Sequence, residues 1–186
     1  MDYLKNLFDI LHSCEYTDVK GDTIDFETML KTMLAEFAER RKAGKIINIG
    51  NGGSAAIASH ATTDLTKNAK IPALCFSDYS TITCLSNDYG YNNAYKEALI
   101  LLAGTDDLLV AVSSSGKSEN ILNAVQKSRE LGNYIITFSG FGKDNPLRKL
   151  GDINIYCPSS HYGMVELCHQ IILHMVTDIL SEDEKS

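Results

Sequence analysis

The chain has 186 residues, of which 44% are apolar and 22% charged, an ordinary composition for one globular domain with a full core. Its formal net charge of −7 argues against broad binding to nucleic acid or to anionic membranes, although a local basic pocket can still hold a phosphate. No signal peptide is visible and no run approaches the roughly 20 apolar residues that span a bilayer, so we expect a cytoplasmic protein without a membrane segment.

The first 44 residues predict two helices. Residues 1–14 carry an apolar stripe at helical spacing, a polar loop is expected from Tyr16 to Thr23, and residues 24–43 predict a longer helix that Gly44 ends. We expect this segment, residues 1–44, to belong to the same domain as residues 45–186. It either covers the sheet or forms an oligomer interface, because its apolar residues exceed one stripe.

From Lys45 onward, strands and helices alternate. This order predicts an α/β fold, a three-layer α-β-α sandwich with a parallel sheet and right-handed crossovers. The expected strands are 45–49, 72–76, 108–113, 134–139 and 153–157, and the expected helices are 54–67, 79–86, 91–103, 118–131, 146–150 and 163–180.

The first strand-to-helix connection, residues 46–64, is rich in glycine. Glycines at 50, 52 and 53 permit positive φ and close approach of a ligand, and Ser54 is the expected helix N-cap. A helix that begins here favours an anion such as phosphate above its free amides. His60 and Asp64 follow four residues apart and share one helix face. The alternative is an ordinary turn whose His and Asp side chains face solvent.

The second such connection, residues 113–118, places four hydroxyls and a glycine between an apolar strand and a helix. Hydroxyls and helix-end amides suit a phosphate monoester, and the alternative is a flexible serine loop. The spacing matches neither a Walker A loop nor a Gly-x-Gly-x-x-Gly dinucleotide loop, which argues against a dehydrogenase. Because both connections follow strand ends, we expect them to share one ligand.

Two further segments carry polar groups. Residues 87–90 read Asn-Asp-Tyr-Gly, which is typical of a turn. The final helix holds Glu166, His169, Gln170 and His174 among apolar residues, where each polar group needs a partner. Its histidines are either satisfied core residues or, with the carboxylate, zinc ligands or proton carriers.

Five blocks resemble the sugar isomerase (SIS) domain in order and spacing: residues 50–54, His60, residues 87–91, residues 113–118 and the helix from Glu166 to His174. The resemblance covers about residues 25–180. Within the family, the blocks resemble the phosphoheptose isomerase group more specifically. It implies a Rossmann-like fold, a homotetramer and one Zn²⁺ or other divalent metal per subunit. The implied reaction converts sedoheptulose 7-phosphate to a D-glycero-D-manno-heptose 7-phosphate-type aldose through an enediol.

The resemblance also implies roles for individual residues. Asp64 is the implied general base, His174 its acid/base partner, and Glu166 a further residue of the catalytic site. The implied metal ligands are His60, Asp64, Glu166 and His174. The implied substrate contacts are Asn51, Gly52, Gly53, Ser54, Asp64, Asn87, Asp88, Ser113, Ser114, Ser115, Ser118 and Glu166, with the serines around the phosphate.

Four positions depart from the group: Asp64 replaces Glu, Glu166 replaces Gln, Asn68 replaces Arg, and Gly163 replaces Asp. Either Glu166 takes over as the base or Asp64 works at shorter reach, and a different heptose or hexose phosphate is an alternative substrate. A second hypothesis is a non-catalytic SIS module that binds a sugar phosphate or a protein partner in regulation. The titratable groups kept at all four metal positions favour the enzyme.

The five cysteines are odd in number, scattered, and without a C-x-x-C spacing. Without an export signal, this usage predicts reduced core thiols and argues against a cysteine zinc site.

Overall fold

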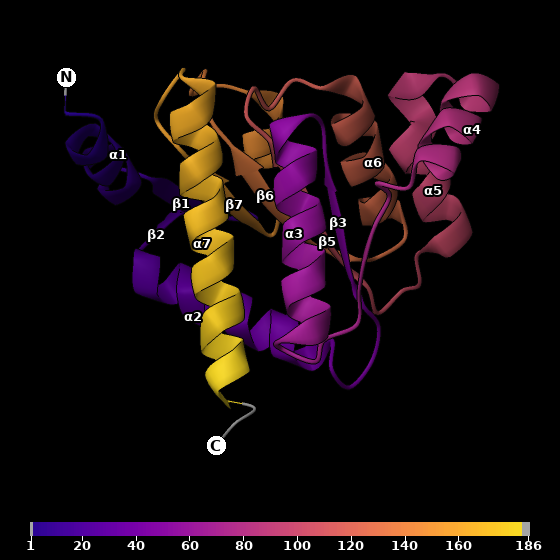
Figure 1. The fold of residues 1–186 in the computed structure, drawn as a ribbon, viewed down its shortest axis with the longest axis horizontal. Coiled ribbons are helices and arrows are strands. Elements are labelled where there is room, and N and C mark those ends of the chain that lie inside the picture. The colour runs from indigo at the N-terminus through magenta and orange to yellow at the C-terminus, as the bar shows by residue number, and fades with distance from the viewer. Residues whose placement is uncertain (1, 184–186) are drawn as a thin grey trace.

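A seven-stranded sheet runs through the middle of the computed structural model, which describes residues 2–183, and helices cover both of its faces (Figure 1). The strand order is β2-β1-β7-β6-β5-β3-β4. The five strands from β7 to β4 are parallel, whereas β1 is antiparallel to β7 and β2 to β1. The strands are β1 (Glu15–Asp18), β2 (Thr23–Ile24), β3 (Ile46–Gly50), β4 (Ala73–Cys75), β5 (Leu108–Ser113), β6 (Tyr134–Ser139) and β7 (Ile153–Tyr156).

The helices form two outer layers, which confirms the predicted three-layer α/β fold. One layer, with α1, α2, α3 and α7, covers one face of the sheet, and α4, α5 and α6 cover the other. The helices are α1 (Tyr3–His12), α2 (Phe26–Glu39), α3 (Gly53–Lys67), α4 (Tyr79–Tyr89), α5 (Ala94–Leu102), α6 (Glu119–Glu130) and α7 (Tyr162–Asp183), with 3-10 turns η1 (Tyr91–Asn93) and η2 (Pro146–Lys149).

Alternating side chains of the central strands supply both halves of the core. On β5, Leu108 and Val110 pack beneath the layer of α3 and α7, while Leu109 and Ala111 pack beneath α5 and α6. Because both faces are covered, every residue of β5 is buried. This double burial explains why the central strands read as nearly continuous apolar runs.

Residues 16–23 do not form the predicted polar loop. They contain β1 and β2, an antiparallel hairpin whose first strand pairs with the edge of β7, with Tyr16 opposite Ile155. The prediction was wrong because these strands are short and polar, and their pairing partner follows far later in the chain. The N-terminal segment therefore shares one sheet with the rest of the chain.

The prediction of a turn at residues 87–90 is also wrong in part, because helix α4 continues through Tyr89. Asp78 caps the start of this helix by accepting a hydrogen bond from the Thr81 amide. Gly90, with φ of 79°, ends the helix. Asn87 and Asp88 therefore lie in the last turn of a helix.

Helix α7 is the one helix in residues 2–183 that is long and apolar enough to cross a membrane by length and composition. Half of its apolar window is buried inside the fold, as in the core helix of a globular protein. Its His169 is fully buried with Nε2 3.1 Å from the Ser139 carbonyl oxygen, and burial lowers the pKa of His169 to about 4. His169 is thus a neutral core histidine.

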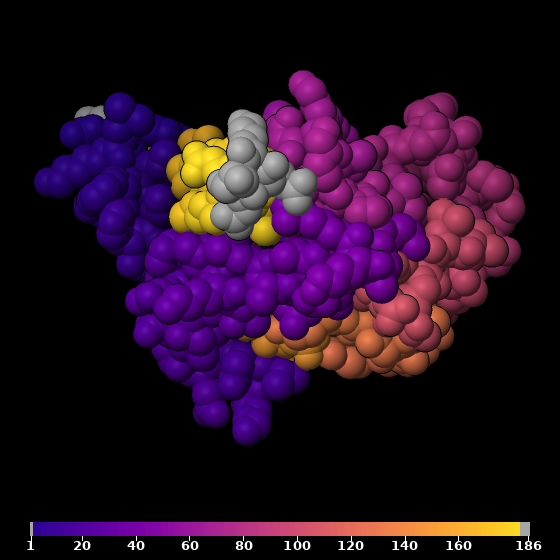
Figure 2. Space-filling view, turned by 90° about the horizontal axis from the view of Figure 1, so that it is seen from below, coloured from indigo at the N-terminus to yellow at the C-terminus, as the bar shows by residue number. Residues whose placement is uncertain are grey.

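The two ends of the sandwich differ. Seen from below, α2 and the residues that follow it spread across the end where the parallel strands begin (Figure 2). The carboxyl ends of the parallel strands lie at the opposite end, where α3 and α7 begin (Figure 1). Ligands of open parallel sheets bind at this carboxyl end.

Candidate functional site

The two predicted connections meet at the switch point of the sheet. Strands β3 and β5 are neighbours, and the helices that follow them, α3 and α6, leave to opposite faces. A cavity of about 390 Å³ opens there, as expected for such a crevice. It is lined by Asn51, Gly52, Gly53, Ser54, Ser113, Ser114, Ser115, Ser118, Tyr162 and Glu166. Both loops therefore line one cavity, and their sharing of one ligand stays a prediction.

The glycine turn needs its glycines for two different reasons. Gly52 has φ of 56° and occupies the N-cap position of α3, so Ser54 is not the N-cap that the sequence predicted. Gly50 has an ordinary φ, but a Cβ there would lie 2.5 Å from the backbone C and O atoms of Ser54. The turn is therefore tight because β3 and the first turn of α3 nearly touch.

We expect Gly50→Ala to destabilise the fold by about 1–3 kcal/mol, because the added methyl overlaps backbone atoms that cannot rotate away. Gly142→Ala is the matched control, since a Cβ at Gly142 meets nothing within 4 Å and its φ is not positive. Urea unfolding of both variants measures the difference. Equal midpoints for the two variants would contradict the close packing at Gly50.

The side chain of Asn51 is held by residues of two other segments, α6 and η1. It exchanges two hydrogen bonds of 2.9 Å with the Asn120 amide of α6, and the Tyr91 hydroxyl donates to its Oδ1 at 2.6 Å. The sequence did not point to Asn120, nor to Tyr162, which lines the cavity. Asn120 lies in the first turn of α6, two residues after the N-cap Ser118. Its place at a helix start beside the serine loop is the sequence feature that could have indicated it.

The serine loop keeps hydroxyls that the fold does not use. The Ser113 and Ser118 hydroxyl oxygens lie 3.4 Å apart. Ser118 stands at the N-cap of α6 but makes no side-chain cap bond, and the buried Ser114 hydroxyl has no hydrogen-bond partner among the described residues. A capping serine normally bonds to the helix amides, so these hydroxyls are available to a ligand.

Three of the four predicted metal ligands come together on what we call the α3–α7 seam, formed by His60, Asp64 and His174. Asp64 Oδ2 lies 3.2 Å from His60 Nε2 and 3.4 Å from His174 Nδ1, and all three donor atoms lie within 4.8 Å of one another. Zinc bonds of about 2.1 Å at tetrahedral angles place donors about 3.4 Å apart. The donor set therefore fits a divalent cation such as zinc.

Glu166, the fourth predicted metal ligand, lies away from that group. It stands two turns before His174 on α7, which is about 12 Å along the helix axis. There it faces Gly53, whose Cβ, if present, would overlap the Glu166 carboxylate. No hydrogen bond or ion pair engages this carboxylate within residues 2–183. Glu166 belongs to the cavity rather than to the seam.

Asn87 and Asp88 are not brought to the cavity. Both are exposed at the end of α4, and the Asn87 amide donates to Asp88 Oδ1 at 2.9 Å. Neither residue lines the cavity in the described part of the chain. Their role as substrate contacts stays a prediction.

Comparison with known proteins gives a consistent result. The sequence pattern of the SIS domain matches residues 26–140. The chain is 36% identical over 152 residues to the phosphoheptose isomerase of Cytophaga hutchinsonii, covering 78% of each chain. It is 32% identical over 165 residues to phosphoheptose isomerase 1 of Campylobacter jejuni, covering 83% of this chain and 88% of that protein. The solved phosphoheptose isomerase of Francisella tularensis superimposes with a TM-score of 0.82 at 26% identity, covering 97% of this chain and 95% of the other.

Proposed function

The chain belongs to the SIS domain family and is related to phosphoheptose isomerases, and from this premise we propose that it is a sugar-phosphate isomerase acting on sedoheptulose 7-phosphate. The product is an aldose of the D-glycero-D-manno-heptose 7-phosphate type. One observation carries this proposal. A cavity lined by serine hydroxyls lies where α3 and α7 begin, and further along the same two helices the α3–α7 seam places a carboxylate between two imidazoles.

The phosphate binds at the serine loop in this proposal. The Ser113, Ser115 and Ser118 hydroxyls and the first amides of α6 supply donors, and the helix N-terminus supplies a positive potential. The described lining contains no Lys or Arg side chain, so the recognition is by hydrogen bonds and helix dipole. A phosphate fixed in this way anchors the sugar and positions its carbons.

The sugar then extends from the cavity along the seam. Six C–C bonds of about 1.5 Å and the phosphate ester give an extended heptose phosphate a length of about 10 Å. This length is close to the two helical turns, about 12 Å, that separate Glu166 from His174. With the phosphate in the cavity that Glu166 lines, Glu166 lies beside the phosphate end of the sugar, and the reacting C1 and C2 lie beside Asp64 and His174.

Proton transfer between C1 and C2 needs a base at carbon and an acid at oxygen. We assign the base to Asp64 and the acid to the His174 ring, whose Nε2 stays free when Nδ1, 3.4 Å from Asp64 Oδ2, faces the metal position. Asn68 donates to the second carboxylate oxygen of Asp64 at 3.3 Å and helps to orient it. The half-exposed imidazoles leave this group accessible to a sugar.

The seam also fits one divalent metal per subunit, held by His60, Asp64 and His174. Zinc is the proposed ion, because imidazole and carboxylate are among its usual ligands. When bound, such an ion supplies a Lewis acid near the sugar oxygens. The metal content of the purified protein, compared with that of His60→Ala, tests this assignment.

We also propose a cytoplasmic homotetramer. Several apolar side chains stay exposed in one chain, including Leu4 and Phe8 on α1 and Leu101 on α5. Burial of such residues favours association. Light scattering is expected to give four times the 20.5 kDa of one chain.

Glu166→Gln is expected to lower KM about tenfold with kcat within about threefold, because it removes an anionic group from the cavity that receives a phosphate. Gln keeps a similar shape and can still hydrogen-bond to the sugar. Steady-state kinetics separate the two constants, and Glu166→Ala shows what loss of the contact costs. A fall in kcat of a hundredfold in Glu166→Gln would instead make Glu166 the base.

The activity itself is tested by NMR of sedoheptulose 7-phosphate with the zinc-loaded protein in D₂O. We expect a new aldose heptose phosphate with deuterium entering at C2, as an enediol route requires. Unchanged substrate that nevertheless binds to the folded protein would favour the regulatory module over the enzyme.

A further inference from the structure

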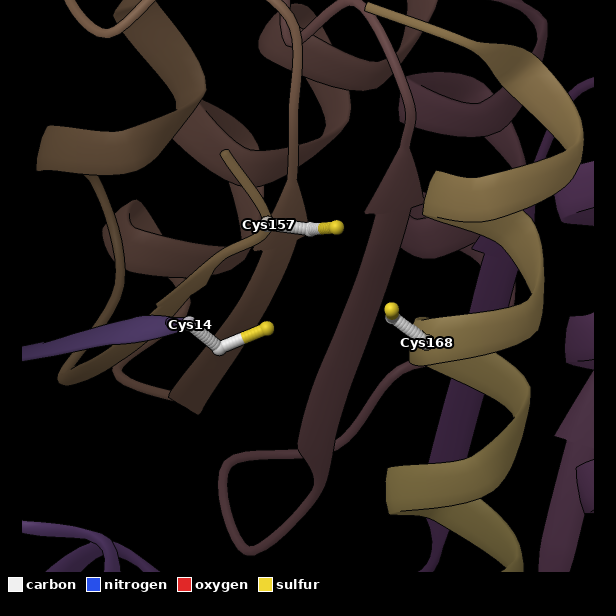
Figure 3. A group of neighbouring side chains, drawn as sticks. All are labelled: Cys14, Cys157 and Cys168. Atoms are coloured by element: carbon white, nitrogen blue, oxygen red, sulfur yellow. The ribbon is translucent and has the colours of Figure 1, made fainter. Parts of the chain in front are cut away.

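Three cysteines that are scattered in the sequence meet in the core. Cys14 stands just before β1, Cys157 just after β7, and Cys168 on α7, and their sulfur atoms converge on one space between the sheet and that helix (Figure 3). The three Sγ atoms lie within 4.8 Å of one another, and all three residues are buried. We call this group the thiol cluster. None of its members lines the cavity or belongs to the α3–α7 seam.

We propose that the thiol cluster is a binding site for one soft, thiolate-preferring metal ion, with Cu(I) as the ion that fits it best. Metal–sulfur bonds of about 2.3 Å in a trigonal arrangement place the sulfurs about 4 Å apart. The observed spacing of at most 4.8 Å reaches this value with small side-chain rotations. Thiolate donor sets select Cu(I) and zinc over harder cations.

The number of donors favours Cu(I) over zinc. No fourth His, Cys, Asp or Glu joins the thiol cluster among the described residues. Structural zinc sites are almost always four-coordinate, whereas Cu(I) accepts three sulfur ligands. Each thiol that binds the ion as thiolate releases its proton to solvent, and copper stays in the +1 state throughout.

The Cys14 thiol makes a contact outside the cluster, donating to the carbonyl oxygen of Ile10 at 3.6 Å, and it would give up this contact on binding a metal.

An entry route lies beside the thiol cluster. An apolar cavity of about 300 Å³ is lined by residues that flank Cys14 and Cys168 in the chain, among them His12, Tyr16, Ile171 and Ile172, together with Met175. Helix α1, which forms one wall, has no buried residue of its own. We infer that an ion approaches the cluster from this side, past the His12 and Met175 side chains, which can act as transient donors.

The test is an anaerobic titration of the full chain with Cu(I) held by a chromogenic competing chelator. The His60→Ala/His174→Ala background removes the seam. We expect one copper per chain to be withheld from the chelator, and X-ray absorption at the copper edge to show a sulfur-only shell of three ligands. Cys14→Ala, Cys157→Ala and Cys168→Ala should each bind this copper with an affinity at least a hundredfold lower. The matched controls Cys75→Ala and Cys84→Ala should keep the affinity of the parent protein.

A second measurement, the melting temperature with and without Cu(I), does not depend on the folding of the three core variants. Binding to the folded state alone should raise the melting temperature of the parent protein and of both control variants. The proposal is wrong if the parent protein withholds no copper, if the bound copper has nitrogen or oxygen ligands, or if Cys75→Ala and Cys84→Ala lose it as readily as the cluster variants.

Discussion

Replacing Asp64 by Asn is expected to lower kcat for the isomerisation by a factor of about 10² to 10⁴, the usual contribution of a positioned acid or base. Asn has the same shape but cannot accept the proton from carbon. His174→Ala should have an effect of similar size, because the two side chains contact each other at 3.4 Å and serve the two ends of one proton transfer. Residues that act as a unit lose activity together rather than additively.

The measurement is the rate of deuterium entry at C2, read by NMR beside overall turnover. Asp106→Asn is the matched control, since Asp106 is exposed and lies outside both the cavity and the seam. Metal analysis of Asp64→Asn separates loss of the base from loss of the ion, because a variant that keeps its metal and still fails has lost the proton acceptor. Full deuterium exchange in Asp64→Asn would exclude Asp64 as the base.

The parts of the fold that local pattern determines could be predicted from the sequence. The central strands are buried on both faces, so their apolar runs stand out against amphipathic helices, and β5 and β6 occupy the expected ranges. The place of the site follows from the same pattern, because loops that leave parallel strands meet at one edge. For this reason the sequence predicts that residues of both loops lie at this edge, where they line the cavity.

The other features of the fold and of the site could not be predicted, because they depend on contacts between segments that lie far apart in the sequence. The β1–β2 hairpin is defined by its pairing with β7, and nothing local to Tyr16 or Thr17 reveals that partner. The same limit applies to Asn120, whose amide matters only because Asn51 faces it. The cysteines show it most clearly, because their scatter along the chain suggested isolated thiols whereas three of them converge in the core.

The double variant Ser113→Ala/Ser118→Ala is expected to lower kcat/KM by a factor of about 10² to 10⁴ with little change in stability. Each hydroxyl that bonds to a charged phosphate contributes about 1.5–3 kcal/mol, and two are removed. The fold should tolerate the change because these hydroxyls bond only to each other, at 3.4 Å, and Ser118 makes no side-chain cap bond to α6. Removing both partners of a hydrogen bond leaves no buried group unsatisfied.

The comparison that decides this prediction uses sedoheptulose with and without its phosphate. If the serine loop holds the phosphate, the double variant should lose activity on the phosphorylated sugar yet treat the free sugar as the parent protein does. Ser181→Ala is the stability control, since that hydroxyl bonds to the Thr177 carbonyl far from the cavity. An equal loss on both sugars would mean that the loop acts on the reacting end of the substrate, which would reverse the orientation in which the phosphate lies at the serine loop and the carbonyl at Asp64.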